Sequence, residues 1–206
     1  PYPQLARLRA EVPVAFVPQL NGIVFTRRDD IDIWEKRIDI FSSEQPGGLM
    51  TRLMGQNMMR HDGDAHQSQR RAMQPAVSPR AVQRHWRNAF REAAVRVLDE
   101  LAPKGRADLC TDYAMTLSGE ALRLITGLDN VTAHEMDAHS QAMIDGISNY
   151  AGDADIEARC LGAVAALDAA IGARLDDFAA SPPDPHSIDG VSVIAVLQRA
   201  GATHDQ

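Results

Sequence analysis

Two side chains in this sequence have the types and the spacing to bind an anion together. His66 and Arg70 are four residues apart, so in a helix their side chains lie on the same face. An imidazolium and a guanidinium can each donate a charge-assisted hydrogen bond, worth roughly 1.5–3 kcal/mol. The pair could therefore clamp a doubly anionic ligand, although the same two residues would also suit a solvated helix face.

Other patterns resemble known motifs but lack the required spacing. His134 and His139 are five residues apart, whereas a zinc-binding helix places its two histidines four apart. Gly47-Gly48 is not followed by the lysine of a phosphate-binding loop. These segments therefore predict neither a metal site nor a phosphate site.

The segment before His66, residues 41–63, is rich in glycine and methionine. It reads as a long, partly ordered loop, and a loop of that length inside a compact domain is usually functional. Its methionines could line a ligand pocket or could fill irregular gaps in the core; they are Met50, Met54, Met58 and Met59.

The elements that must position these residues are mostly helical. Asp64 is a candidate N-cap, and Gln67 completes a capping box, so the helix that carries His66 is expected to begin there. Ser78-Pro79 marks the start of a second helix. Apolar residues at spacings of three and four predict one buried stripe along it, made of Val82, Trp86, Phe90, Ala93, Val97 and Leu101.

The amino-terminal part has a different pattern. Short apolar runs at residues 14–17 and 23–26 flank Asn21-Gly22, which is a hairpin signal, and short helices are expected on either side. The sequence thus predicts a mainly α chain with a small amino-terminal β-sheet. Residues 1–206 are expected to form a single partial domain, with the sheet, short helices and loop in residues 1–63 and helices in residues 64–206.

Composition narrows the class of protein. The net charge of -7 argues against general nucleic-acid binding. No apolar run approaches the roughly 20 residues that span a bilayer, and no signal peptide is visible at Pro1. The lack of such a run predicts no membrane association. Cys110 and Cys160 lie far apart and outside any Cys-x-x-Cys pair, which favours a reducing, cytoplasmic compartment.

Several spaced segments, in the same order, make the whole chain resemble bacterial cytochromes P-450. This resemblance is more specific than the His66 and Arg70 pair alone. It covers essentially all 206 residues and corresponds to the amino-terminal half of that fold. The segments that carry it are residues 1–9, 12–14, 24–31, 41–43, 62–71 and 105–109.

The resemblance implies a role for each candidate residue. His66 and Arg70 would bind the propionates of heme b, and Met58 and Met59 would lie against the haem edge. The loop before them would cover the distal pocket and place Leu53 and Met54 near substrate. An acidic ferredoxin or flavodoxin-type electron donor would dock on a surface that includes Arg71 and Arg80.

The sequence also departs from the family. The usual Asp-Pro-Pro-Glu before the histidine is Asp62-Gly63-Asp64-Ala65 here, and glycine in place of proline should loosen that turn. The helices and the glycine-rich loop that hold the haem-thiolate cysteine would follow residue 206. Cys110 and Cys160 both sit in helix-like sequence without the open loop that such a ligand needs. No catalytic residue and no iron ligand are therefore expected in these 206 residues.

The resemblance implies a haem-dependent monooxygenase that inserts one oxygen atom from O2 into a small apolar substrate. These residues would supply the propionate clamp and the distal lid of that oxidoreductase, and alone would be inactive. Two alternatives stay open. The chain could be a haem-free, truncated helical module that binds a partner or an apolar ligand, or it could be one part of a longer chain.

Overall fold

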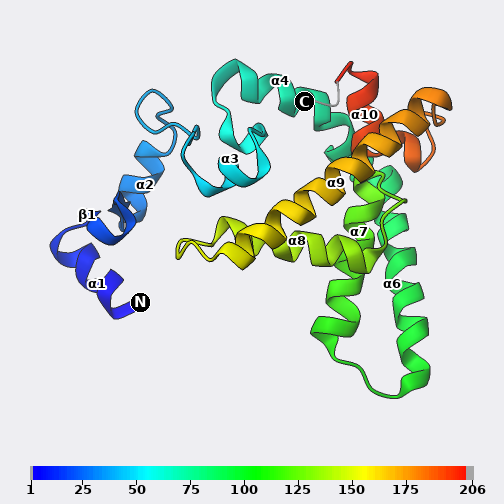
Figure 1. Ribbon diagram of the computed structural model, residues 1–206, viewed down its shortest axis with the longest axis horizontal. Helices are drawn as coiled ribbons and strands as arrows, with labels where there is room; N and C mark the ends of the chain where they lie inside the picture. The colour runs from blue at the N-terminus through cyan, green and yellow to red at the C-terminus, as the bar shows by residue number, and fades with distance from the viewer. Residues whose placement is uncertain (1, 203–206) are drawn as a thin grey trace.

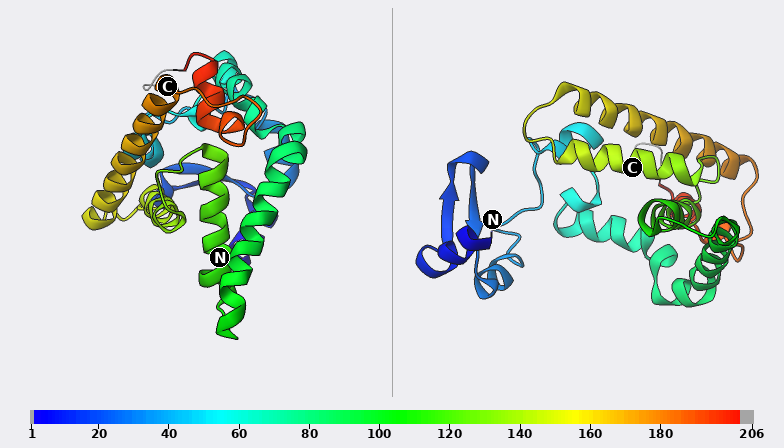
Figure 2. Two further views of the ribbon diagram at one scale, coloured as in Figure 1. Left: turned by 90° about the vertical axis from the view of Figure 1, so that its right-hand side faces the viewer. Right: turned by 90° about the horizontal axis from the view of Figure 1, so that it is seen from below.

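The computed structural model describes residues 2–202, which form two unequal parts (Figure 1). Residues 2–41, here the amino-terminal lobe, hold a hairpin and two short helices. Residues 49–202, here the helical body, hold the remaining elements. Figure 2 shows the lobe standing apart from the body, joined to it by an extended connection.

The bounds of the elements confirm the mainly helical prediction. The lobe contains α1 (Tyr2–Glu11), β1 (Val14–Val17), a 3-10 turn (Pro18–Leu20), β2 (Gly22–Phe25) and α2 (Arg28–Trp34). The α-helices of the body are α3 (Leu49–Met54), α4 (Gly63–Val77), α5 (Pro79–Ala81), α6 (Arg87–Leu101), α7 (Thr116–Thr126), α8 (Ala133–Ile147), α9 (Ala154–Ala180) and α10 (Val193–Arg199). Short 3-10 turns lie at Met58–Arg60, Ala102–Lys104 and Asp189–Val191, and π-helical turns at Val82–Trp86 and Leu109–Met115. No helix within residues 2–202 is long and apolar enough to cross a membrane.

The predicted hairpin is present, but its turn is longer than a two-residue turn. Strands β1 and β2 pair antiparallel, with Val14 opposite Phe25 and Val17 opposite Gly22. The 3-10 turn precedes Asn21, whose φ of 44° lies in the left-handed region that asparagine tolerates better than most residues. The Asn21-Gly22 signal therefore marks the end of the turn.

The predicted start of α4 at an Asp64 cap is wrong. The helix begins at Gly63, and its N-cap residue is Asp62, whose side chain makes no capping bond. The Asp62 carboxylate instead accepts hydrogen bonds from the Ser42 hydroxyl at 2.7 Å and the Ser43 backbone N–H at 2.9 Å. Gly63 has a φ of +55°, which the fixed ring of proline cannot adopt. The backbone before α4 therefore has a conformation here that the Asp-Pro-Pro-Glu pattern would not allow.

The second helix begins where predicted, and its apolar stripe is interrupted. The Ser78 hydroxyl accepts from the Ala81 N–H at 3.1 Å, which confirms the cap. A π-helical turn over Val82–Trp86 then joins α5 to α6. Because this turn changes the rotation per residue, Val82 is 46% exposed while Trp86 is fully buried. The Trp86 indole N–H donates to the Ala76 carbonyl at 2.7 Å.

The core lies where α7, α8, α9 and α10 meet. Gly119 of α7 lies so close to the Ala133 carbonyl of α8 that an added Cβ would be 2.3 Å from that oxygen. Arg174 is nearly buried and donates from Nε to the Gly127 carbonyl at 3.0 Å. The apolar side chains around this crossing form one cluster: Leu128, Val131, Met136, Phe178, Ile194 and Ala195.

Residues 41–63 are more structured than the predicted loop. They contain helix α3 and the turn Met58–Arg60. Helix α3 packs against α8 and α9, and Leu53 is 5% exposed there. An added Cβ on Gly146 would lie 3.3 Å from Leu53 Cδ1 and 2.4 Å from Cys160 Sγ, so these three residues are closely packed. Tertiary packing onto the body thus orders the middle of this segment.

Candidate functional site

His66 and Arg70 lie on consecutive turns of α4, as their spacing predicts. His66 is half-buried, and its Nδ1 lies 3.1 Å from the backbone carbonyl oxygen of Met58. Arg70 is exposed. Within residues 2–202, neither His66 Nε2 nor the Arg70 guanidinium has a hydrogen-bond or ion-pair partner, so neither is engaged by the rest of the chain.

The turn that precedes α4 brings Met58 and Met59 to different environments. The Asn57 side chain caps this turn by accepting from the Met59 N–H at 3.1 Å. Met58 is half-buried and lines a pocket, whereas Met59 is 61% exposed. The Met58 carbonyl also forms the hydrogen bond with His66, which connects this turn to α4.

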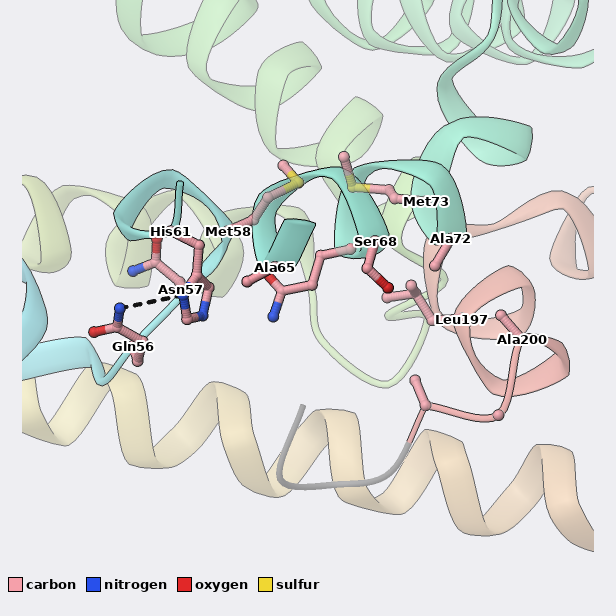
Figure 3. Close-up of a pocket in the computed structure, with 13 residues that line it drawn as sticks. Gln56, Asn57, Met58, His61, Ala65, Ser68, Ala72, Met73, Leu197 and Ala200 are labelled. Carbon is pink, nitrogen blue, oxygen red and sulfur yellow. Dashed lines mark hydrogen bonds between the residues drawn. The ribbon is translucent and has the colours of Figure 1, made fainter. Parts of the chain in front are cut away.

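A pocket of about 550 Å³ lies between this turn, α4 and the end of α10 (Figure 3). One end is polar: the Gln56 amide donates to the Arg60 carbonyl at 2.7 Å and approaches His61 Nδ1 at 3.4 Å. The other end is formed by small and apolar side chains, among them Ala72 and Leu197. The pocket could therefore hold a molecule with one polar end.

The two predicted substrate residues are adjacent at the end of α3. Leu53 is buried against α8 and α9, as described above. Met54 is half-buried. Of the two, Met54 has the side chain that a ligand could reach without displacing the core.

The two predicted donor-docking residues, Arg71 and Arg80, are both exposed. Arg71 Nε donates to the Gln67 carbonyl of its own helix at 3.2 Å. Neither guanidinium forms an ion pair within the part of the chain that the structure describes. Their positive charge is therefore available to an acidic surface.

Sequence reasoning missed three polar features near the site. Asp62 bonds to Ser42 and Ser43 instead of capping α4, and the Ser42 hydrogen bond lowers the pKa of the Asp62 carboxyl below its ordinary value. Two further atoms, Arg60 Nε and Gln69 Oε1, are buried without a hydrogen-bond partner. No motif marks Asp62 for this role, because its partners Ser42 and Ser43 are distant in the sequence.

The two cysteines lie in separate environments. Cys110 is exposed, whereas Cys160 is fully buried beside Gly146, and this burial raises the pKa of its thiol. A raised pKa disfavours the thiolate form. Among residues 2–202, no three side chains of His, Cys, Asp or Glu are close enough to share a metal ion.

Comparison with known proteins identifies the fold. No protein-family model matches the chain. A C-19 steroid 1alpha-hydroxylase from Sorangium cellulosum (strain So ce56) is 27% identical over 144 residues, which are 68% of this chain and 36% of that protein.

Solved structures resemble the chain over nearly all of its length. P450BioI, solved in complex with an acyl carrier protein ligated to hexadec-9Z-enoic acid, matches 100% of this chain with a TM-score of 0.82 and 16% identity. Cytochrome P450 260B1 of Sorangium cellulosum So Ce56 matches 95% with a TM-score of 0.70 and 24% identity. This chain covers 54% and 52% of those two chains. The resemblance is therefore confirmed: the chain has the fold of the amino-terminal half of a cytochrome P450.

Proposed function

We propose that this chain is the amino-terminal half of a haem-dependent monooxygenase and that His66 and Arg70 bind the propionates of heme b. The observation that carries the proposal is that His66 and Arg70 share one face of α4 and that neither has an anionic partner within residues 2–202. In the cytochrome P450 fold, an unpaired His and Arg at this place would suit a ligand with two carboxylates.

The donor set fits such a ligand. A guanidinium presents a planar fork of N–H groups that matches a carboxylate, and it stays charged at every physiological pH. An imidazolium adds a second charge-assisted donor one helical turn away. Met58 and Met59 precede this pair and would offer apolar, polarisable contacts to the haem edge.

The bound haem would supply the oxygen chemistry, while this chain would position and shield it. The iron ligand would be a cysteine thiolate from outside these residues, because Cys160 is buried in the α8–α9 packing and Cys110 lies on an exposed π-helical turn. In the net reaction, a substrate C–H bond and O2 become an alcohol and water, with two electrons and two protons consumed.

A small apolar substrate would contact Leu53 and Met54 of the lid formed by residues 41–63. Two relatives support an apolar class of substrate: one is named as a steroid hydroxylase, and another binds a fatty acyl group on a carrier protein. The half-buried Met54 would make the more direct contact. Leu53 would act mainly by holding α3 against α8 and α9.

The electrons would come from a ferredoxin or flavodoxin-type donor in the cytoplasm. Arg71 and Arg80 would attract its acidic surface, since both are exposed and lack ion pairs within residues 2–202. Attraction of this kind accelerates association and is screened by salt. Arg71→Ala should therefore slow electron transfer from the donor, and the loss should be greater at low salt.

A titration of the whole enzyme with haem tests the clamp. Arg70→Ala should weaken haem retention by roughly 1.5–3 kcal/mol, because one carboxylate loses a charge-assisted partner. Arg71→Ala is the matched control, since it removes the neighbouring exposed arginine and should leave haem content unchanged. Equal loss in both variants, or haem binding unaffected by Arg70→Ala and by His66→Ala, would contradict the assignment of the clamp. A wild-type protein that binds no haem would favour the haem-free module.

A further inference from the structure

The hydrogen bond between His66 and Met58 fixes which nitrogen of the imidazole carries a proton. Nδ1 lies 3.1 Å from the Met58 carbonyl oxygen. A carbonyl oxygen can only accept, so Nδ1 must donate and must therefore be protonated. In the neutral ring the other nitrogen, Nε2, is then an unprotonated acceptor.

In this tautomer, Nε2 of the neutral ring cannot bind a carboxylate. A carboxylate is also only an acceptor, so it cannot form a hydrogen bond with an unprotonated Nε2. The two lone pairs would face each other. Nε2 can donate to a carboxylate only when the ring carries both protons, that is, as an imidazolium. Arg70 has no such requirement, because its guanidinium is always charged.

No charged group near His66 forms an ion pair with its ring within residues 2–202. Asp62, the residue just before α4, has its carboxylate bound to Ser42 and Ser43 and forms no ion pair with His66. The Ser42 hydrogen bond is the main cause of the lowered pKa of Asp62, and the nearby His66 lowers that pKa slightly further. The Arg199 guanidinium of α10 donates to the Gly190 carbonyl. The other titratable or charged groups on α4 near the ring, and on the elements packed against that helix, are Arg60, His61, Asp64, Arg70, Arg71 and Arg80.

We infer that His66 is a proton-gated half of the carboxylate clamp, with the Met58 carbonyl as the group that positions its ring and sets the tautomer. This inference rests on the proposed function. At low pH the imidazolium and Arg70 each bind one carboxylate. When the ring loses its proton, Arg70 alone holds the ligand, and the affinity for the dicarboxylate falls.

The neighbouring His61 provides an internal contrast. Its Nδ1 lies 3.4 Å from the Gln56 amide nitrogen, which can only donate, so this Nδ1 must accept. The two histidines are therefore expected to be opposite tautomers. A ¹⁵N spectrum of the protein at neutral pH should show the proton on Nδ1 of His66 and on Nε2 of His61. A neutral His66 protonated on Nε2 would overturn the inference without bearing on the fold or on Arg70.

Binding of metal-free protoporphyrin IX, compared with its dimethyl ester, tests the gate without relying on iron ligation. The ester lacks both carboxylates, so the ratio of the two affinities isolates the clamp. In the wild-type protein this ratio should fall about tenfold once the His66 ring has lost its second proton at high pH, because one charge-assisted donor is then missing. His66→Gln should make the ratio nearly independent of pH, because a glutamine amide donates a hydrogen bond at every pH. His61→Gln is the matched control and should keep the wild-type dependence.

The outcomes separate two kinds of failure. If the free acid binds no better than the ester at any pH, the clamp itself is absent and the proposed function fails. If the acid binds better by the same factor at every pH, or if His66→Gln retains the pH dependence, the clamp stands and the gating by His66 is wrong.

Discussion

The amino-terminal lobe and the helical body contrast sharply in how their side chains are buried. In the described lobe, no residue is buried, and apolar side chains such as Phe16 and Ile23 are 60% and 62% exposed. In the body, Trp86 and Cys160 are fully buried. Both regions nevertheless have regular elements that their sequence patterns predicted. Local patterning is therefore enough to specify a hairpin and short helices, while burial requires facing elements.

The lobe is held together by local contacts. They include an aromatic cluster: the Phe41 ring centroid lies 5.4 Å from that of Phe25, edge-on, and 6.2 Å from that of Trp34. The two strands have no further strand beside them in the described residues, and a lone hairpin is marginally stable in water. The body instead gains most of its stability from buried apolar area. Substitutions in the two regions should consequently differ in cost.

The largest expected difference is between a buried and an exposed aromatic residue. Trp86→Ala should destabilise the protein by about 3–5 kcal/mol, since it leaves a large cavity. It also orphans the Ala76 carbonyl, which accepts from the indole N–H. Phe16→Ala in the lobe should change the free energy of unfolding by less than about 0.5 kcal/mol. Urea unfolding followed by circular dichroism compares the two, and similar costs would abolish the distinction between the regions.

A smaller difference is expected between two helical glycines of the body. Gly119→Ala should destabilise by about 1–3 kcal/mol, because the new methyl would meet the Ala133 carbonyl at 2.3 Å. Gly162→Ala is the matched control in α9, where nothing lies within 4 Å of the added Cβ. That change should stabilise by about 0.5–1 kcal/mol through helix propensity. Thermal unfolding of both variants measures this, and a neutral Gly119→Ala would mean that α7 and α8 can move apart.

Much of the fold was predictable because its signals are local. The Ser78 cap, the hairpin near Asn21 and the spacing of His66 and Arg70 all depend on residues within a few positions of one another. The exposure of Val82 was not predictable, since one π-helical turn shifts the phase of the stripe. Nor was the Met58 contact to His66, because a backbone carbonyl leaves no trace in the choice of amino acid.

The contacts of Asp62 were also not predictable from local sequence patterns. They connect the lobe to the body. The position of Asp62 before α4 suggested a local role, but its carboxylate binds the hydroxyl of Ser42 and the N–H of Ser43, which follow the lobe directly. These contacts span about twenty positions in the sequence. The pairing fixes the end of the lobe to the start of the helix that carries His66. Loss of this contact should loosen the lobe while leaving the core of the body intact.

The smallest expected effect is the pH dependence of the hydrogen bonds that Asp62 accepts from Ser42 and Ser43. Hydrogen bonds, above all from the Ser42 hydroxyl, lower the pKa of Asp62 below its ordinary value of 3.8. A lowered folded pKa means that the stabilisation is fully present above pH 3.8 and is lost as the pH falls through the folded value. The Ser43 amide resonance should therefore titrate below pH 3.8. Asp62→Asn keeps an acceptor oxygen but no charge, so its Ser43 amide should not titrate there. A wild-type titration at or above 3.8 would mean that the Asp62 contact does not hold the lobe to the body.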